Sequence, residues 1–253
     1  MAERPILFSG PMVRAILEGR KTQTRRVVKP QPSHFTPGPN VHHPRHPAAY
    51  FDAYCNAPKT DANPRGMSGR WCWWTPDNRQ GPDWIRCPYG VPGDRLWVRE
   101  TWYCDDAFAG RDECVGCVRC SHTTADRIAA WREALFYRAD GEAHEQFEQL
   151  DHGSGHIWRP SIHMPRWASR LALEVTCVRV ERLHDISEAD AQTEGVLCEN
   201  LDRRGDVCRI VTPSQHWRYH FQDLWASINS LDSWRANPWV WVVEFRRAEG
   251  ATS

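Results

Sequence analysis

The stretch LALEVTCVRVE, residues Leu171–Glu181, predicts a long strand and is the strongest indication of the fold class. Its apolar residues alternate as far as Cys177, and the next residue, Val178, begins an alternation in the opposite phase. Because period-two alternation places successive side chains on opposite faces of a strand, a change of phase predicts a β-bulge. A bulge bends its strand, and a bent strand of this length is typical of a small β-barrel.

Further elements are predicted on both sides of this strand. Trp239–Phe245 (WVWVVEF) is a predicted strand buried on at least one face, and apolar residues at helical spacing over Ser214–Ile228 predict a helix. Gly19 and Gly195 each end a shorter predicted helix, because glycine adopts the left-handed conformation of a helix end at no steric cost. Shorter strands are predicted at residues 6–8, 27–29, 96–99 and 134–138.

The irregular order of strands and short helices favours the α+β class over a doubly wound sheet. We expect one domain over residues 1–253, a small bent β-barrel with short helices around it and two irregular insertions. The first insertion, at about 31–84, is rich in proline, histidine and tryptophan, and the second, at about 103–156, is rich in cysteine. The opening residues lack the layout of a secretory signal and no apolar run approaches the ~20 residues of a membrane span, so we expect a cytoplasmic protein without a membrane partner.

The charge of the chain sums to zero but is unevenly distributed. The 32 Lys and Arg residues equal the 32 Asp and Glu residues, which argues against a protein that holds nucleic acid by bulk electrostatics. Residues 1–30 carry seven bases and two acids, a net of +5, whereas residues 183–207 carry seven acids and two bases, a net of −5. The two segments either face one another across a cleft or are separate solvated surfaces.

The segment GRKTQTRR, Gly19–Arg26, is the most informative basic stretch, and it holds one of only three lysines in the chain. If the backbone turns after Lys21, its amine and the hydroxyl of Thr24 come within hydrogen-bond reach. A neutral lysine can then take the threonine proton, and nearby arginines such as Arg25 and Arg26 lower the lysine pKa by repulsion. The alternative is a turn that binds phosphate or carboxylate without any chemistry.

The pattern G-x-K-x-x-x-x-R, present as Gly19, Lys21 and Arg26, resembles the signature of the ASCH domain. That family belongs to the PUA-like superfamily of small β-barrels that handle RNA and modified bases. The stretches PGDRLWVRETW, WRPSIHMPRWASRLALEVTCVRVERL, ISEADAQTEGV and ANPWVWVVEF are similar to those of larger, often prophage-encoded ASCH proteins. The resemblance covers roughly residues 1–30, 85–102 and 157–247.

One branch of the family consists of compact bacterial amidohydrolases that convert N4-acetylcytidine to cytidine without a catalytic cofactor. Carried over to this chain, the resemblance implies that Lys21 acts as a base toward Thr24, whose hydroxyl, or a water it positions, attacks the acetyl carbonyl. Glu194, late in the ISEADAQTEGV helix, would relay a proton to the departing amine. Arg26 would stabilise the oxyanion or hold substrate. This chain is more than twice as long as those enzymes, so its insertions are expected to close or reshape the pocket.

The expected partner is a modified cytosine nucleoside or single-stranded RNA, with Arg25 and Arg26 as substrate-binding residues. Most of the 14 tryptophans are expected to pack in the core, but Trp97 and Trp102 are candidates for stacking on a base. Two other functions stay open. The chain is alternatively a non-catalytic module that binds RNA or a modified base, or an endoribonuclease whose basic turn stabilises the transition state.

Four cysteines form a second candidate site with metal-ligand spacing. Because the chain lacks a secretion signal, reduced thiols or metal ligands are expected in place of disulfides. Four thiolates satisfy a tetrahedral zinc ion, which would staple the insertion and take no part in chemistry. An iron–sulfur cluster and unligated thiols are the alternatives, and Cys72 or Cys87 can replace one ligand. The four cysteines are Cys104, Cys114, Cys117 and Cys120.

Overall fold

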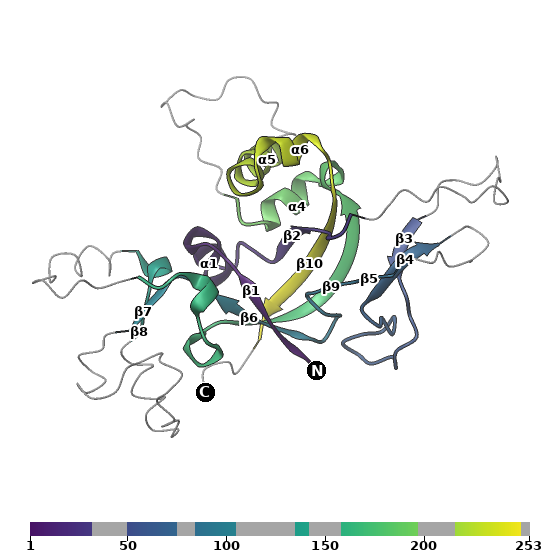
Figure 1. Cartoon of the computed structure of the whole chain (residues 1–253), viewed down its shortest axis with the longest axis horizontal. Helices are drawn as coiled ribbons and strands as arrows, with labels where there is room; N and C mark the ends of the chain where they lie inside the picture. Colours follow the sequence, from purple (N-terminus) through teal and green to yellow (C-terminus); the bar gives the residue numbers. More distant parts are fainter. Residues whose placement is uncertain (32–49, 75–83, 105–134, 142–157, 197–215, 249–253) are drawn as a thin grey trace, which may run out of the picture.

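The computed structural model describes residues 1–31, 50–74, 84–104, 135–141, 158–196 and 216–248. Its centre is a five-stranded sheet with the strand order β1-β6-β9-β10-β2 (Figure 1). The first pair in this order is parallel and the other three pairs are antiparallel. The strands are β1 (Glu3–Leu7), β2 (Gln23–Val27), β6 (Arg95–Arg99), β9 (Ala172–Arg182) and β10 (Trp239–Arg247).

The central sheet is open, which corrects the expectation of a closed barrel. Strands β1 and β2 stand at opposite ends of the strand order, and no ladder joins them in the described ranges. Closure of a barrel requires such a ladder between the two edge strands. Here the edges meet through a side chain instead, because the guanidinium of Arg26 in β2 donates a hydrogen bond to the carbonyl of Leu7 in β1. The mixture of this sheet with a few helices agrees with the α+β class.

The change of phase in the long strand is confirmed as a bulge. Glu244 of β10 lies opposite Cys177, whereas the next residue, Phe245, lies opposite Val175. Thr176 therefore has no partner in the register, and the residues beyond it change face. Figure 1 shows β9 curving across the sheet alongside β10.

The sequence pattern predicts that this last strand is buried on at least one face, and in the structure β10 is buried on both faces. Trp241, Val243 and Phe245 belong to the main core. Val240 and Val242 point to the other face, into a second core beneath α4 (Glu188–Thr193) and α5 (His216–Asn229). Figure 1 shows these two helices and α6 (Leu231–Arg235) stacked over this side of the sheet.

Two short helices end where the glycines predict. Helix α1 (Gly10–Leu17) is followed by Gly19 at a φ of +77°, and α4 is followed by Gly195 at +78°. The Ser187 hydroxyl caps α4 by accepting a hydrogen bond from the backbone N–H of Asp190 at 3.0 Å. None of the helices in the described ranges is long and apolar enough to cross a membrane.

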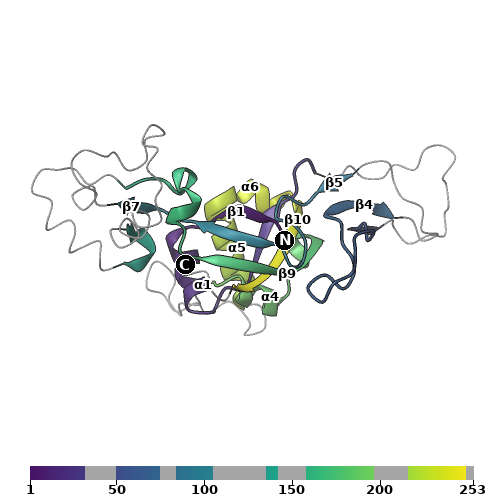
Figure 2. The ribbon, with the colours of Figure 1, turned by 90° about the horizontal axis from the view of Figure 1, so that it is seen from below.

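Both predicted insertions contain strands, so their expected irregularity is only partly right. Figure 2 shows their two small sheets on opposite sides of the central sheet. Trp71 fixes the first of them, because its buried ring meets Trp241 of β10 edge-on at 5.4 Å between centroids. The first sheet contains β3 (Tyr50–Ala53), β4 (Arg70–Trp74) and β5 (Ile85–Arg86), and the second contains β7 (Trp102–Cys104) and β8 (Leu135–Tyr137). Single 3₁₀ turns are formed by Arg138–Asp140, Ser161–His163, Arg166–Ala168 and Leu183–Asp185.

Candidate active site

The basic turn after α1 pairs with the end of α4. The backbone N–H of Lys21 folds back onto the carbonyl of Ala15 at 3.0 Å, which turns the chain out of α1. The N–H of Thr22 then donates to the carbonyl of Thr193 at 3.0 Å, and Lys21 forms an antiparallel bridge with Glu194. Two segments that are far apart in the sequence are therefore held side by side by their backbones.

Lys21 and Glu194 form a buried ion pair. The Lys21 amine donates to the Glu194 carboxylate, with 2.9 Å between Nζ and Oε2, and to the Glu194 backbone carbonyl at 2.8 Å. Lys21 is 2% exposed and Glu194 is 3% exposed. Burial lowers the pKa of the Lys21 amine below its usual range, and the adjacent carboxylate opposes this effect without cancelling it.

Arg25 occupies the other oxygen of the same carboxylate. Its Nη1 lies 3.2 Å from Glu194 Oε1, and its Nη2 lies 3.0 Å from Asp190 and 3.1 Å from Glu181. Arg179 contacts Asp190 from the other side at 3.2 Å. Burial raises the pKa of Asp190, but Arg25 and Arg179 outweigh it and leave that pKa below its usual value. The basic N-terminal segment and the acidic segment therefore face one another at these residues.

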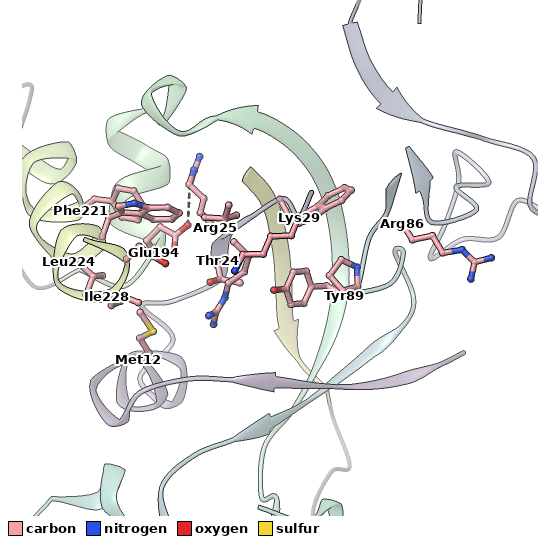
Figure 3. A pocket seen from close by; sticks show the side chains of 16 residues that line it. Met12, Thr24, Arg25, Lys29, Arg86, Tyr89, Glu194, Phe221, Leu224 and Ile228 are labelled. Carbon is pink, nitrogen blue, oxygen red and sulfur yellow. Dashed lines mark hydrogen bonds and ion pairs between the residues drawn. The ribbon is translucent and has the colours of Figure 1, made fainter. Parts of the chain in front are cut away.

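A pocket with a volume of about 410 Å³ opens beside this ion cluster. Four of the predicted site residues line it, namely Thr24, Arg25, Arg26 and Glu194. Figure 3 shows an apolar wall from α5 on one side, Tyr89 on the other, and Thr24 and Glu194 between them. The full lining also includes Met12, Val27, Lys29, Arg86, Pro88, Phe221, Leu224, Trp225, Ile228, Asn229 and Trp241.

Lys21 does not line the pocket, but it contacts a residue that does. Strand β2 begins at Gln23, four residues earlier than predicted, because Gln23–Val27 pairs along β10 with Thr24 opposite Val243. Thr24 is therefore a strand residue, and the hydrogen bonds of the Lys21 amine go to Glu194. The structure thus brings Thr24 and Glu194 to one pocket and places Lys21 behind the carboxylate.

The two tryptophans predicted to bind a base lie away from this pocket. Trp97 is in β6, where the Arg99 guanidinium lies 5.4 Å from its ring centroid. Trp102 is 1% exposed and packs edge-on against Trp167 at 6.0 Å in a separate small core. A ring buried in this way has no face free for a base. The tryptophans that do line the pocket are Trp225 and Trp241, which the sequence pattern assigns to the core.

Several pocket residues carry no signal in the sequence. Arg86 and Tyr89 lie around the last strand of the first small sheet, whose approach to the basic turn is a tertiary effect. Burial raises the pKa of the Tyr89 hydroxyl, which agrees with its place against the pocket wall. Lys29 is the one residue that composition could have indicated, because lysine is so rare in this chain.

The cysteine site falls mostly outside the described residues. Cys114, Cys117 and Cys120 are not among them, and Cys104 is the last residue of β7. Cys72 and Cys87 are buried, and burial raises the pKa of the Cys87 thiol to about 12. Within the ranges that the structure describes, no group of three or more His, Cys, Asp or Glu side chains is arranged to hold a metal ion. The zinc site stays a prediction.

Comparisons with family models, with curated proteins and with solved structures give no match to this chain. The resemblance to the ASCH family therefore depends on the residues quoted above. What stands independently of it is the geometry: a buried Lys21–Glu194 pair, a neighbouring Thr24, and a pocket that Thr24 and Glu194 share.

Proposed function

We propose that this chain is an ASCH-type amidohydrolase that removes the acyl group from an N4-acylated cytosine nucleoside such as N4-acetylcytidine. The observation that carries the proposal is the buried contact of 2.9 Å between Lys21 Nζ and Glu194 Oε2 beside a pocket that Thr24 also lines. These three residues are the ones that the resemblance names, although they come from two distant segments. A lysine, a hydroxyl and a carboxylate in one place suit acyl transfer, because it needs a base, a nucleophile and a proton donor.

The base in this proposal is Lys21. Its buried amine has a lowered pKa and gives up its proton more readily than an exposed lysine does. In the neutral form it accepts the proton of the Thr24 hydroxyl, directly or through a water that the hydroxyl positions. An arginine at this position would not serve, because its pKa stays above about 12.

The carboxylate completes the proton path. Thr24 Oγ1 attacks the acyl carbonyl, the C–N4 bond breaks, and the amine leaves with a proton that passes from Lys21 through Glu194. Water then hydrolyses the threonine ester, so that one amide and one water become one carboxylate and one amine. The Arg26 guanidinium lines the same pocket and is available to hold the substrate there.

The proposal also includes the fold relationship, namely that the central sheet is a PUA-like sheet left open at one side. Two features support it. The long strand β9 carries a bulge at Thr176, and the edge strands approach closely enough for Arg26 to reach the Leu7 carbonyl. The small sheets from the two insertions lie outside this unit (Figure 2).

The direct test is incubation of the full-length protein with N4-acetylcytidine, followed by mass spectrometry for cytidine. We expect cytidine and acetate in equal amounts, and loss of both with Lys21→Ala. Lys59→Ala is the matched control, because Lys59 is an exposed lysine outside the pocket. Equal activity in Lys21→Ala and Lys59→Ala would reject the assigned base.

The second candidate is a module that binds a modified base without catalysis. One observation favours it: the Lys21 amine makes its hydrogen bonds to Glu194, an arrangement that also suits a purely structural ion pair. This candidate expects saturable binding of N4-acetylcytidine with no cytidine released over many hours. The same incubation therefore separates the two functions.

A further inference from the structure

The pocket carries three cations without a carboxylate partner among the described residues. Arg26, Lys29 and Arg86 all line it. In the part of the chain that the structure describes, none of the three forms an ion pair with an aspartate or glutamate. Lys21 and Arg25, by contrast, are both held by the Glu194 carboxylate. The pocket therefore has a surplus of positive charge apart from its buried ion cluster.

One of these cations also has a free donor. Arg26 donates to the Leu7 carbonyl through Nη2, and its guanidinium lies 5.2 Å from the ring centroid of Phe8. Its Nε is buried and has no hydrogen-bond acceptor among the described residues. A buried N–H without an acceptor is unfavourable, so a ligand that supplies an acceptor is favoured.

The apolar residues of α5 form one side of the pocket, whereas Lys29 lies in its middle and Arg86 at the opposite side (Figure 3). Phe221, Leu224 and Ile228 come from α5, whereas Tyr89 lies across from them and Arg86 lies beyond Tyr89 (Figure 3). The first side suits a flat apolar group such as a base, and the second suits an anion. A ligand that fills both sides has a base at one end and negative charge at the other.

We propose that Arg26, Lys29 and Arg86 form a subsite for the phosphate of a nucleotide, so that a phosphorylated ligand binds more tightly than the free nucleoside does. The inference deepens the proposed function and rests on it for the identity of the base. Arginine binds phosphate through paired N–H donors and lysine through a point charge, so the set matches a phosphate ester. Two of its members, Lys29 and Arg86, lie outside the residues that the family resemblance names.

The test measures binding of three probes to the full-length protein by isothermal titration calorimetry: cytidine, cytidine 5′-monophosphate and a short cytidine-containing oligoribonucleotide. None of the probes carries the acyl group, so binding is read independently of turnover. We expect a phosphorylated probe to bind about tenfold or more tightly than cytidine, since its contacts are charge-assisted. A gain for the monophosphate identifies a mononucleotide ligand, whereas a gain for the oligonucleotide alone identifies a strand.

The variant Lys29→Gln/Arg86→Gln removes two exposed cations from the pocket, and Lys59→Gln/Arg247→Gln removes two exposed cations elsewhere as a matched control. We expect the first variant to lose the tighter binding of the phosphorylated probes. We also expect the slope of the logarithm of its binding constant against the logarithm of the salt concentration to become shallower by about one for each cation removed. The control should keep both the tighter binding and the slope. The proposal is overturned if cytidine binds as tightly as both phosphorylated probes, if no phosphorylated probe binds, or if the two variants behave alike.

Hydrolysis of N4-acetylcytidine and of its 5′-monophosphate, measured in parallel, separates this inference from the proposed function. Phosphate-dependent binding without hydrolysis would keep the subsite and reject the amidohydrolase. Hydrolysis that the pocket variant leaves unchanged, together with phosphate-independent binding, would keep the amidohydrolase and reject the subsite.

Discussion

Two carboxylates in the described part of the chain are almost completely buried, and they differ in what lies beside them. Glu194 is 3% exposed and Glu100 is 1% exposed. Glu194 contacts both Lys21 and Arg25, and it lines the pocket. Glu100 follows β6 and is held by Arg170 at 3.0 and 3.1 Å, outside the pocket lining.

The second ion cluster is completed by contacts within the protein. Arg170 also contacts Asp140 at 2.7 and 2.9 Å, and its guanidinium lies 3.9 Å from the centre of the Tyr137 ring. Buried charge is therefore not enough to mark a site. The Glu194 cluster is distinguished by a pocket on one side and by an amine that can change its protonation state.

The largest effect is expected when the two carboxylates are neutralised in turn. Glu194→Gln should lower kcat by about 10²–10⁴-fold, because it removes a proton donor, and should destabilise the fold by about 3–5 kcal/mol, because Lys21 and Arg25 lose a buried partner. Glu100→Gln should change stability less, because burial already favours the neutral form of Glu100, and should leave kcat unchanged. Steady-state kinetics and urea unfolding measure both quantities. A similar fall in kcat for the two variants would remove the distinction between the clusters.

The next effect concerns the glycine that lets the turn approach α4. A Cβ on Gly195 would lie 2.7 Å from Lys21 Cβ and 2.9 Å from Ala15 Cβ, at a φ of +78°. Gly141 has a φ of +72°, but a Cβ there would meet nothing closer than 3.9 Å. Both Gly→Ala changes should cost about 1–2 kcal/mol of unfolding free energy for the backbone conformation. Gly195→Ala alone should displace Lys21 and reduce activity as well, and activity equal to that of Gly141→Ala would contradict this.

A smaller effect separates the tryptophans of the two regions. Trp225 lines the pocket, whereas Trp102 packs in the small core beside β7 and β8. Trp225→Phe should weaken the binding of N4-acetylcytidine, and Trp102→Phe should lower only the melting temperature. Binding titrations and thermal unfolding of both variants give the answer. Weaker binding in Trp102→Phe at unchanged stability would restore that residue as a base contact.

The smallest effect is in the pH dependence of stability. The contribution of Asp190 to the free energy of unfolding increases with pH, whereas that of Glu100 decreases. Arg25 and Arg179 leave the pKa of Asp190 below 3.8, so its contribution is complete above that pH and is lost as the pH falls below it. Burial raises the pKa of Glu100 above 4.5, so its contribution is complete below 4.5 and is lost as the pH rises through the folded value. The free energy of unfolding, measured in urea from acid to neutral pH, should depend less on pH in both variants. Asp190→Asn should reduce its dependence at the acid end, and Glu100→Gln should reduce its dependence above pH 4.5. Unchanged slopes in either variant would contradict the assigned pKa direction.

Local patterns predicted the parts of the fold that local physics determines. The change of phase at Cys177 and Val178 anticipated the bulge, and Gly19 and Gly195 anticipated two helix ends. The start of β2 was missed because pairing with β10, not the sequence of the turn, extends the strand to Gln23. The closed barrel was wrong because a bulge indicates curvature but not whether two edge strands pair.

The site was predictable to the extent that single segments carry it. Lys21 and Thr24 stand in one short basic stretch, and Glu194 was placed beside them only through the family resemblance. The partners of Arg25 were not predicted, because its ion pairs with Asp190 of α4 and Glu181 of β9 depend on how the helix packs against the sheet. Arg86 and Tyr89 were missed for the same reason.

The central claim is that Thr24 is the group that attacks the acyl carbonyl or positions the attacking water. Thr24→Val removes the hydroxyl at nearly constant volume, and Thr24→Ser keeps it. Initial rates of cytidine formation from N4-acetylcytidine should fall by at least about 100-fold in Thr24→Val and be largely retained in Thr24→Ser. Equal rates in the two variants, or no cytidine from the unmodified protein, would contradict the account.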